Sequence, residues 1–251
     1  MSLGFLAAGA ALTSLLWTEN KAVNESDSPS SESESSSNSS KPTIKDAWKV
    51  VTSNPDIMLV GTVQSLFEAA MYIFVLQWPP AISKAVSAAF ASSSATPYGT
   101  VFSCFMASCL FGSTLFGKWI GKIPTESFAT GMLATATASM AGSVIAAKNA
   151  SLYPLMLSFF LFEACVGMYF PSIGTLRSKY IPDSHRGVIL NLFGIPLNVL
   201  VVSVFLSIQY LGVTGALTVS AGALGVATCA MFRLLTRMKQ SETNESAPAT
   251  A

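Results

Sequence analysis

The sequence predicts an all-α, polytopic membrane protein with six membrane-spanning helices. Of the 251 residues, 51% are hydrophobic and only 11% are charged, whereas ordinary soluble domains carry roughly 25% charged residues. A helix needs about 20 predominantly apolar residues to cross a bilayer. Six stretches meet this requirement: 57–78, 99–120, 126–147, 152–174, 187–211 and 213–235. The net charge of +1 gives no reason to expect a nucleic acid or an acidic partner.

Short segments rich in turn-forming residues separate these six spans. We expect Pro79 and Pro80 to end the first span, and 83–97 to form a small external loop, because proline interrupts a helix. The remaining spans are separated by 121–124, 148–151, 179–186 and 212–215. Together, residues 54–239 are predicted to form one six-helix unit.

The two polar segments outside this unit are predicted to be disordered. Residues 18–53 contain the run SDSPSSESESSSNSS, which has too little apolar surface to form a core, and residues 240–251 are similar. The shorter apolar piece within 1–17 leaves two interpretations open. It is either the hydrophobic part of a signal peptide or the end of a membrane helix, and the absence of a preceding basic residue favours the helix.

Basic residues are distributed very unevenly between the two sides of the membrane. With six spans, twelve fall on one side and two, Lys84 and Lys148, on the other. The twelve are Lys21, Lys41, Lys45, Lys49, Lys118, Lys122, Arg177, Lys179, Arg186, Arg233, Arg237 and Lys239. Because lysine and arginine accumulate on the cytoplasmic side, the linker and the C-terminus are predicted to be cytoplasmic.

Two acidic residues lie in the middle of otherwise uncharged spans. Glu68 interrupts 57–78 and Glu163 interrupts 152–174. A charge at membrane depth costs several kcal/mol, so such a residue is expected to face a bundle interior or a water-filled cavity. Gln64, Glu68 and Tyr72 recur every fourth residue and therefore share one helix face. This face either lines a cavity or forms structural hydrogen bonds to neighbouring helices.

Two later spans carry further polar or irregular positions. In the fourth span, Gly167 permits close helix approach, and Pro171 should kink or end the helix near Glu163. In the fifth span, Asn191, Gly194 and Asn198 lie on one face. This face either contacts a small polar solute or packs against another helix.

The sequence contains no enzyme motif that we can identify. It has no P-loop, no zinc-protease motif and no glycine-rich dinucleotide motif. The four cysteines lack metal-ligand spacing, so we predict neither a metal site nor a cofactor. We therefore expect a protein that is not an enzyme and does not hydrolyse ATP.

Three segments resemble the molybdate-anion transporter family of the major facilitator superfamily. These are GTVQSLFEAAMYIFV at 61–75, EACVGMYFPS at 163–172 followed by LRSKYIPD at 176–183, and NLFGIPLN at 191–198. The resemblance extends over residues 54–239 and implies a six-helix half-bundle of the major facilitator type. It further implies that 1–17 is the end of helix six, 18–53 the central linker, and that an N-terminal half is missing from this chain.

The resemblance also implies a function and a set of site residues. The function is secondary active transport at the plasma membrane by alternating access, with molybdate as the substrate. Candidates for coupling or substrate contact are Glu68, Glu163, Gln64, Tyr72, Asn191 and Asn198. Candidates for a gating loop are Gly117, Lys118, Gly121 and Lys122, although the acid of the superfamily motif is absent from GKWIGK.

One departure from the family weakens the case for molybdate. The family's eleventh-helix segment usually carries an arginine where this chain has Gly194, and a guanidinium suits an oxyanion. On the predicted spans, no basic residue remains in the interior of any helix. Transport of another small solute, or a non-transporting role as a membrane partner protein, therefore stays open. Both acids are expected to be protonated or paired whenever an anion binds.

Overall fold

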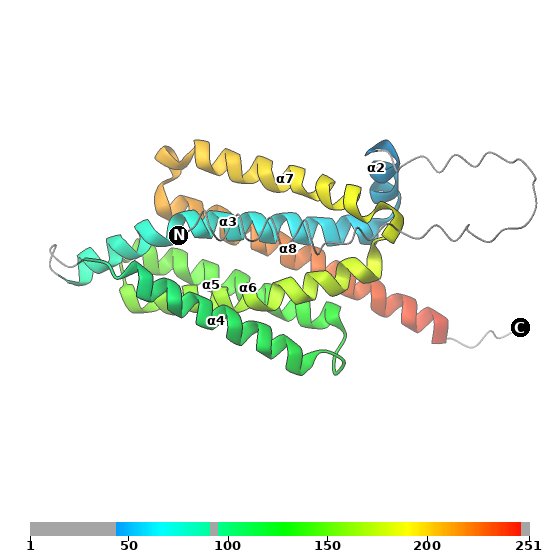
Figure 1. Ribbon diagram of the computed structural model, residues 1–251, viewed down its shortest axis with the longest axis horizontal. Helices are drawn as coiled ribbons and strands as arrows, with labels where there is room; N and C mark the ends of the chain where they lie inside the picture. Colours follow the sequence, from blue (N-terminus) through cyan, green and yellow to red (C-terminus); the bar gives the residue numbers. More distant parts are fainter. Residues whose placement is uncertain (1–43, 91–94, 247–251) are drawn as a thin grey trace, which may run out of the picture. The chain divides into compact units, whose positions relative to one another are not determined.

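The computed structural model describes residues 44–90 and 95–246, and the only regular secondary structure within those ranges is helical (Figure 1). Its helices are α2 (Ile44–Ser53), α3 (Pro55–Ala89), α4 (Tyr98–Trp119), α5 (Thr125–Lys148), α6 (Leu152–Tyr180), η1 (Asp183–His185), α7 (Arg186–Leu206) and α8 (Ile208–Ser246). The predicted helix end at 1–17 and most of the predicted linker lie outside the described residues.

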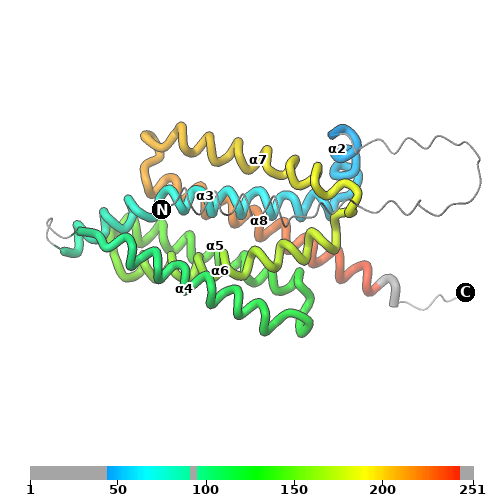
Figure 2. The backbone as a smooth tube through the Cα atoms, viewed as in Figure 1, coloured from blue at the N-terminus to red at the C-terminus, as the bar shows by residue number. Residues whose placement is uncertain are grey.

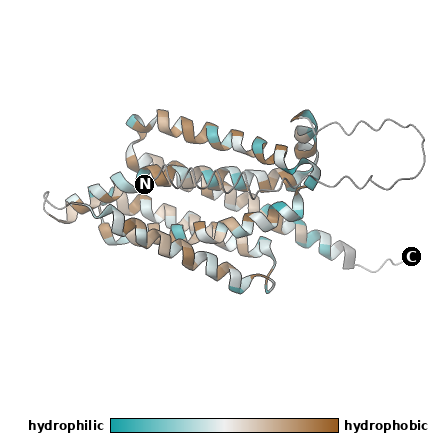
Figure 3. Ribbon diagram, viewed as in Figure 1, coloured by the Kyte–Doolittle hydropathy of each residue, from teal (hydrophilic) through white to brown (hydrophobic). Residues whose placement is uncertain are grey.

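Six helices of the described part are long and apolar enough to cross a membrane, which confirms the predicted fold class. They lie within Pro55–Ala89, Tyr98–Trp119, Thr125–Lys148, Leu152–Tyr180, Asp183–Leu206 and Ile208–Thr243. Successive spans run in opposite directions (Figure 2). Hydrophobic residues dominate along the spans, whereas hydrophilic residues gather in α2 and toward the end of α8 (Figure 3).

Two helices, α3 and α6, form the centre of the bundle. α3 packs against α6, α7 and α8, while α6 also packs against α4 and α5. α5 and α8 pack against each other behind this pair, and α2 packs against α7. α4 and α7 therefore lie at opposite edges of the bundle (Figure 1).

A cluster of stacked aromatic rings holds the two central helices together. The rings of Phe67 and Tyr169 are nearly parallel, with centroids 3.9 Å apart and an interplanar angle of 15°. Phe74 of α3 meets Phe159 and Phe162 of α6, each at 5.0 Å between centroids. All five rings are fully buried. Because lipid is as apolar as leucine, such shape-dependent contacts are what associate helices inside a membrane.

Two glycines allow α4 and α6 to touch through their backbones. A Cβ atom at Gly112 would lie 1.9 Å from the carbonyl oxygen of Ala164. Reciprocally, a Cβ atom at Gly167 would lie 1.9 Å from the carbonyl oxygen of Cys109. Any larger side chain at either position must push the two helices apart. The close approach predicted for Gly167 is therefore present.

Pro79 and Pro80 do not end α3, contrary to the prediction from the sequence. α3 continues through Pro79 and Pro80 to Ala89, so residues 83–89 of the predicted loop are helical. The buried side chains of Ala81, Ile82 and Ala85 explain this, because their packing offsets the hydrogen bonds that the two prolines cannot donate. α6 similarly continues through Pro171 to Tyr180.

Both segments predicted to be disordered are helical where the structure describes them. The last ten residues of the predicted linker form α2, because Ala47 and Val51 are buried in a small core with Ile181, Ile189 and Phe193. α8 extends into the predicted tail as far as Ser246. The break expected at 212–215 does occur, since Gly212 has a φ of 59° inside the helical run from Ile208 to Ser246.

The backbone contact between α4 and α6 predicts opposite effects for two glycine substitutions on α6. Gly167→Ala should lower the thermal stability of the protein in detergent, because overpacking costs about 1–3 kcal/mol. Gly174→Ala is the matched control, since no atom lies within 4 Å of its added Cβ. This control should be neutral or stabilising, because alanine favours a helix more than glycine does. Equal melting temperatures for the two variants would contradict the close contact.

Candidate functional site

Four polar side chains from α3 and α6 form a connected cluster. The Nη2 atom of Arg177 lies 3.0 Å from Oε1 of Glu68, and its Nε donates to Oε1 of Gln64 at 2.9 Å. The hydroxyl of Tyr169 donates to the same Glu68 oxygen at 3.0 Å. One carboxylate oxygen thus receives two donors, one of them charged. Of the six candidates predicted from the sequence, Gln64 and Glu68 are the two that meet here.

Local helix geometry explains why these residues converge. Gln64 and Glu68 are one turn apart on α3 and so point the same way. Tyr169 lies on α6, where stacking against Phe67 holds its ring beside α3. Arg177 lies about 12 Å further along α6, since a helix rises 1.5 Å per residue. The Arg177 and Tyr169 side chains therefore reach the same Glu68 oxygen from positions about two turns apart on α6.

The cluster is buried on one side and accessible on the other. The side chains of Arg177 and Glu68 are 25% and 21% exposed, whereas Gln64 and Tyr169 are buried. One turn beyond Glu68, Tyr72 is 49% exposed. The predicted stripe of Gln64, Glu68 and Tyr72 therefore leads from the bundle interior to its surface. A charged pair at the edge of such a face can exchange partners without unfolding the helices.

The second intramembrane acid does not join this cluster. Glu163 is 7% exposed and lies on α6, four residues before Gly167, whose backbone touches α4. Within the described part of the chain, no hydrogen bond or ion pair reaches the Glu163 carboxylate. The two acids that stand out in the sequence thus occupy different environments.

The predicted polar face of α7 is also separate from the cluster. Asn191 and Asn198 are exposed, and Asn198 donates its Nδ2 to the carbonyl oxygen of Gly194 at 2.7 Å. The space beside Gly194 is open, because the nearest atom to an added Cβ is that same Nδ2 at 3.8 Å. A hydrogen bond links α7 to α3: the Ser65 hydroxyl of α3 donates to the carbonyl oxygen of Phe193 in α7 at 2.7 Å.

The predicted gating segment lies at the turn between α4 and α5. Gly121 has a φ of 78°, and Gly117, Lys118 and Lys122 are exposed. Glu126 follows this segment in the sequence and lies in the first turn of α5. Its buried carboxylate accepts from the Tyr180 hydroxyl at 2.7 Å and from Nζ of Lys179. These hydrogen bonds connect the start of α5 to the end of α6.

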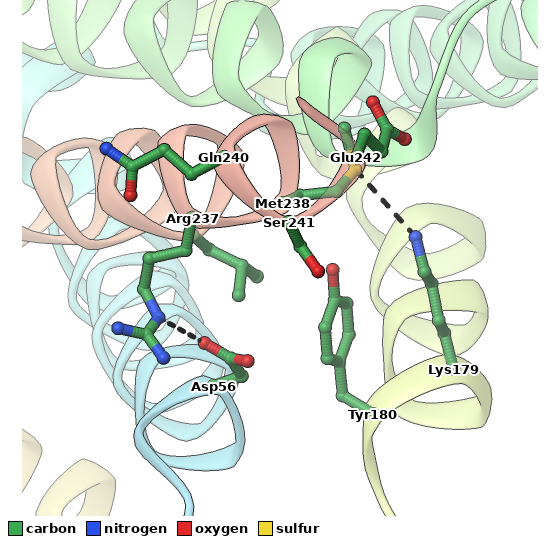
Figure 4. A pocket seen from close by; sticks show the side chains of 9 residues that line it. Asp56, Lys179, Tyr180, Arg237, Met238, Gln240, Ser241 and Glu242 are labelled. Atoms are coloured by element: carbon green, nitrogen blue, oxygen red, sulfur yellow. Dashed lines mark hydrogen bonds and ion pairs between the residues drawn. The ribbon is translucent and has the colours of Figure 1, made fainter. Parts of the chain in front are cut away.

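A polar hollow adjoins these bonds at the same end of the bundle. It has a volume of about 470 Å³ and lies between the start of α3, the end of α6 and the last turns of α8 (Figure 4). Arg237 crosses it to Asp56, with 2.6 Å between Nε and Oδ1. Lys179 also approaches the sulfur of Met238 at 3.9 Å. These contacts connect the ends of α3, α6 and α8, so we interpret this hollow as a structural junction.

Arg177 and Tyr169 are the site residues that sequence reasoning missed. Arg177 was assigned to the end of a helix, with the other basic residues that mark the membrane boundary. The structure corrects the inference that no basic residue serves the helix interiors, because α6 extends to Tyr180 and includes Arg177. The available signal was Glu68 itself, since an ionisable residue in a span commonly pairs with another one.

No group of three or more histidine, cysteine, aspartate or glutamate side chains in the described residues has the arrangement of a metal site. The cluster on α3 and α6 instead combines a guanidinium, a carboxylate, an amide and a phenol. These groups suit reversible binding of a small charged or polar solute.

Comparison with known proteins gives the family. A model of major facilitator proteins, described as sugar transporters with 12 transmembrane segments, matches residues 1–167. Molybdate-anion transporters are similar to the chain in sequence. The relative from Takifugu rubripes is 32% identical over 165 residues, which cover 62% of this chain and 32% of that protein.

Two further molybdate-anion transporters match the chain with similar identity and coverage. The one from Xenopus tropicalis is 32% identical over 57% of this chain and 31% of its own length. The one from Danio rerio is 30% identical over 62% of this chain and 31% of its own length. The matched region thus spans about a third of the length of these relatives. No solved structure matches the chain. Since the family model covers more than half of the sequence, the chain belongs to this twelve-span transporter family of the major facilitator superfamily.

Proposed function

We propose that this chain forms part of a secondary active transporter for a small anion, with molybdate as the substrate. The observation that carries the proposal is the ion pair between Arg177 and Glu68 on an accessible face of the bundle. The names of the similar proteins support the choice of molybdate. The absence of enzyme motifs supports transport without a chemical reaction on the solute.

Arg177 is the proposed anion-binding residue. A guanidinium has five N–H donors in a rigid fork that matches oxyanions well. In the structure, Nε is bound to Gln64 and Nη2 to Glu68. The family usually carries an arginine on its eleventh helix, at the position where this chain has Gly194. In this chain, Arg177 of α6 is proposed to provide the guanidinium that binds the anion.

Glu68 is the proposed coupling residue. While it is ionised, it occupies Arg177 and repels an approaching anion. Protonation of Glu68 removes its charge and weakens its hold on the guanidinium. An anion and a proton would then bind together, because each makes the binding of the other more favourable.

The accessible face is proposed to meet a second set of six helices. Sites in this superfamily lie between two halves near the middle of the bilayer. The relatives are about three times as long as the matched region, which supports a larger assembly. Tyr72, Asn191 and Asn198 are candidates for polar contacts to the solute, and Glu163 for a second coupling role. Orientation with a cytoplasmic linker and C-terminus, location in the plasma membrane and the absence of enzymatic activity belong to the same proposal.

A second candidate function is transport of a neutral polar solute such as a sugar. The description of the matching family supports it, because that description names sugar transporters. Competition experiments distinguish the two candidates. An anion transporter should be inhibited by tungstate, whereas a sugar transporter should be inhibited by unlabelled sugars.

Removing the charge of Arg177 should abolish anion uptake. We expect Arg177→Gln in the full-length transporter to lower molybdate uptake at least tenfold, or about 1.4 kcal/mol of binding. Arg177→Lys should retain part of it, because it keeps the charge and loses the fork. Arg233→Gln, which alters an exposed residue of α8, is the control and should behave normally. Cells without their own molybdate transport provide the assay. Normal uptake by Arg177→Gln would refute the proposed role.

Removing the charge of Glu68 should abolish the pH dependence of uptake. Because an anion and a proton are proposed to bind together, uptake by the unmutated protein should rise with the proton concentration. Glu68→Gln resembles the protonated form and should make the pH profile flat. Asp183→Asn, an exposed acid beyond α6, should leave the profile unchanged. If Glu68→Gln and the unmutated protein share one pH profile, Glu68 does not couple transport to protons.

A further inference from the structure

An apolar groove runs between α2, α3 and α7. Its volume is about 470 Å³, and its lining includes Trp48, Met58, Leu66, Leu192, Pro196 and Val199. The hydroxyls of Thr62 and Ser65 also border it, but both donate to backbone carbonyls, of Met58 and Phe193. The groove therefore offers a ligand almost entirely hydrocarbon surface.

The groove lies along membrane-spanning helices and starts at their end. From Met58 to Leu66 it follows α3 for about 12 Å, at 1.5 Å per residue. Both α3 and α7 are long enough to span a bilayer. Apolar surface exposed at this depth contacts lipid chains unless another protein segment covers it.

The groove and the polar residues occupy different faces of α7. With 100° of rotation per residue, Leu192, Pro196 and Val199 are centred about 130° away from Asn191, Gly194 and Asn198. Of the groove lining on α7, Ile195 approaches the asparagine face, at about 40° from Asn191, so a second transporter half that contacts the asparagines leaves most of the groove open. This separation favours lipid as the occupant.

Exposed basic residues lie on α2, the helix that contributes Trp48 to the groove lining. Lys45 and Lys49 are one helical turn apart and exposed. Between them Trp48 is 60% exposed, and Ile44 before them is 66% exposed. Buried Ala47 and Val51 fix α2 against the bundle. Tryptophan prefers the membrane interface, and lysines beside it attract anionic headgroups.

We propose that one anionic phospholipid binds here, with an acyl chain in the groove and its phosphate group between Lys45 and Lys49. The lipid comes from the leaflet on the lysine-rich side of the protein. Its headgroup would connect α2 to the membrane surface, while its chain fills the space between α3 and α7. This site is independent of the anion site around Arg177.

Native mass spectrometry of the full chain in detergent tests the headgroup. Phosphatidylserine should bind at least about fivefold more tightly than phosphatidylcholine. The double variant Lys45→Gln/Lys49→Gln should remove this preference. The matched control Lys84→Gln/Lys148→Gln carries the same charge change on the opposite side of the membrane and should keep it. Loss of the preference in both double variants, or in neither, overturns the proposal.

A second pair of variants tests the groove. Val199→Phe adds bulk inside the groove and should weaken phosphatidylserine binding at least threefold. Val202→Phe is the control, because Val202 is an exposed residue of α7 that does not line the groove, and it should bind normally. Glycerol phosphate, which lacks acyl chains, should not compete. Competition by glycerol phosphate, or equal binding by the two valine variants, overturns the acyl-chain site.

Discussion

The pairing of Glu68 with Arg177 is the interaction on which the arrangement of the central helices depends. An ionised carboxylate inside a membrane span needs a partner, and a lost partner leaves an uncompensated charge. Here the acid belongs to α3 and the base to α6. Their contact, with the Tyr169 hydroxyl and the stacked Phe67 ring, fixes the rotation of one helix against the other. Because α4 and α5 pack on α6, and α7 and α8 on α3, the positions of all four depend on this central pair.

The two edges of the bundle are attached to this centre in different ways. α4 meets α6 backbone to backbone at Gly112 and Gly167, with no space for a side chain. α7 instead inserts the Phe193 ring where Gly61 lacks a side chain, and adds one hydrogen bond from Ser65. A ring can change its rotamer, whereas a backbone contact cannot adjust without separating the helices. The α4–α6 contact is therefore the more rigid of the two, and the apolar groove borders the more adaptable one.

Composition and hydropathy were sufficient to predict the six spans and to single out Glu68 as an acid inside a span, because both depend on local sequence. The partner of Glu68 was not predictable in the same way. Basic residues near span ends normally extend toward water. Arg177 was therefore counted with the other lysines and arginines that mark one side of the membrane. Its inward orientation depends on where α3 lies in space. The continuation of α3 past Pro79 likewise depends on tertiary packing, as does the folding of α2, which is anchored by Ala47 and Val51. The helical spacing of Ile44, Ala47, Trp48 and Val51 does indicate an amphipathic helix in α2, whereas no such periodic pattern marks the continuation of α3.

Charge balance connects the geometry of the cluster to the proposed transport cycle. Arg177 supplies one positive charge, and an ionised Glu68 neutralises it. A bound oxyanion beside an ionised Glu68 would leave excess negative charge in a medium that solvates it poorly. The cluster can therefore hold the carboxylate or the anion on Arg177, but not both at full charge. Proton uptake by Glu68 and anion binding to Arg177 then become two parts of one equilibrium, so coupling requires no signal between distant sites. A neutral sugar would not impose this exclusion, which is why the ion pair favours an anion over the solute named by the matching family.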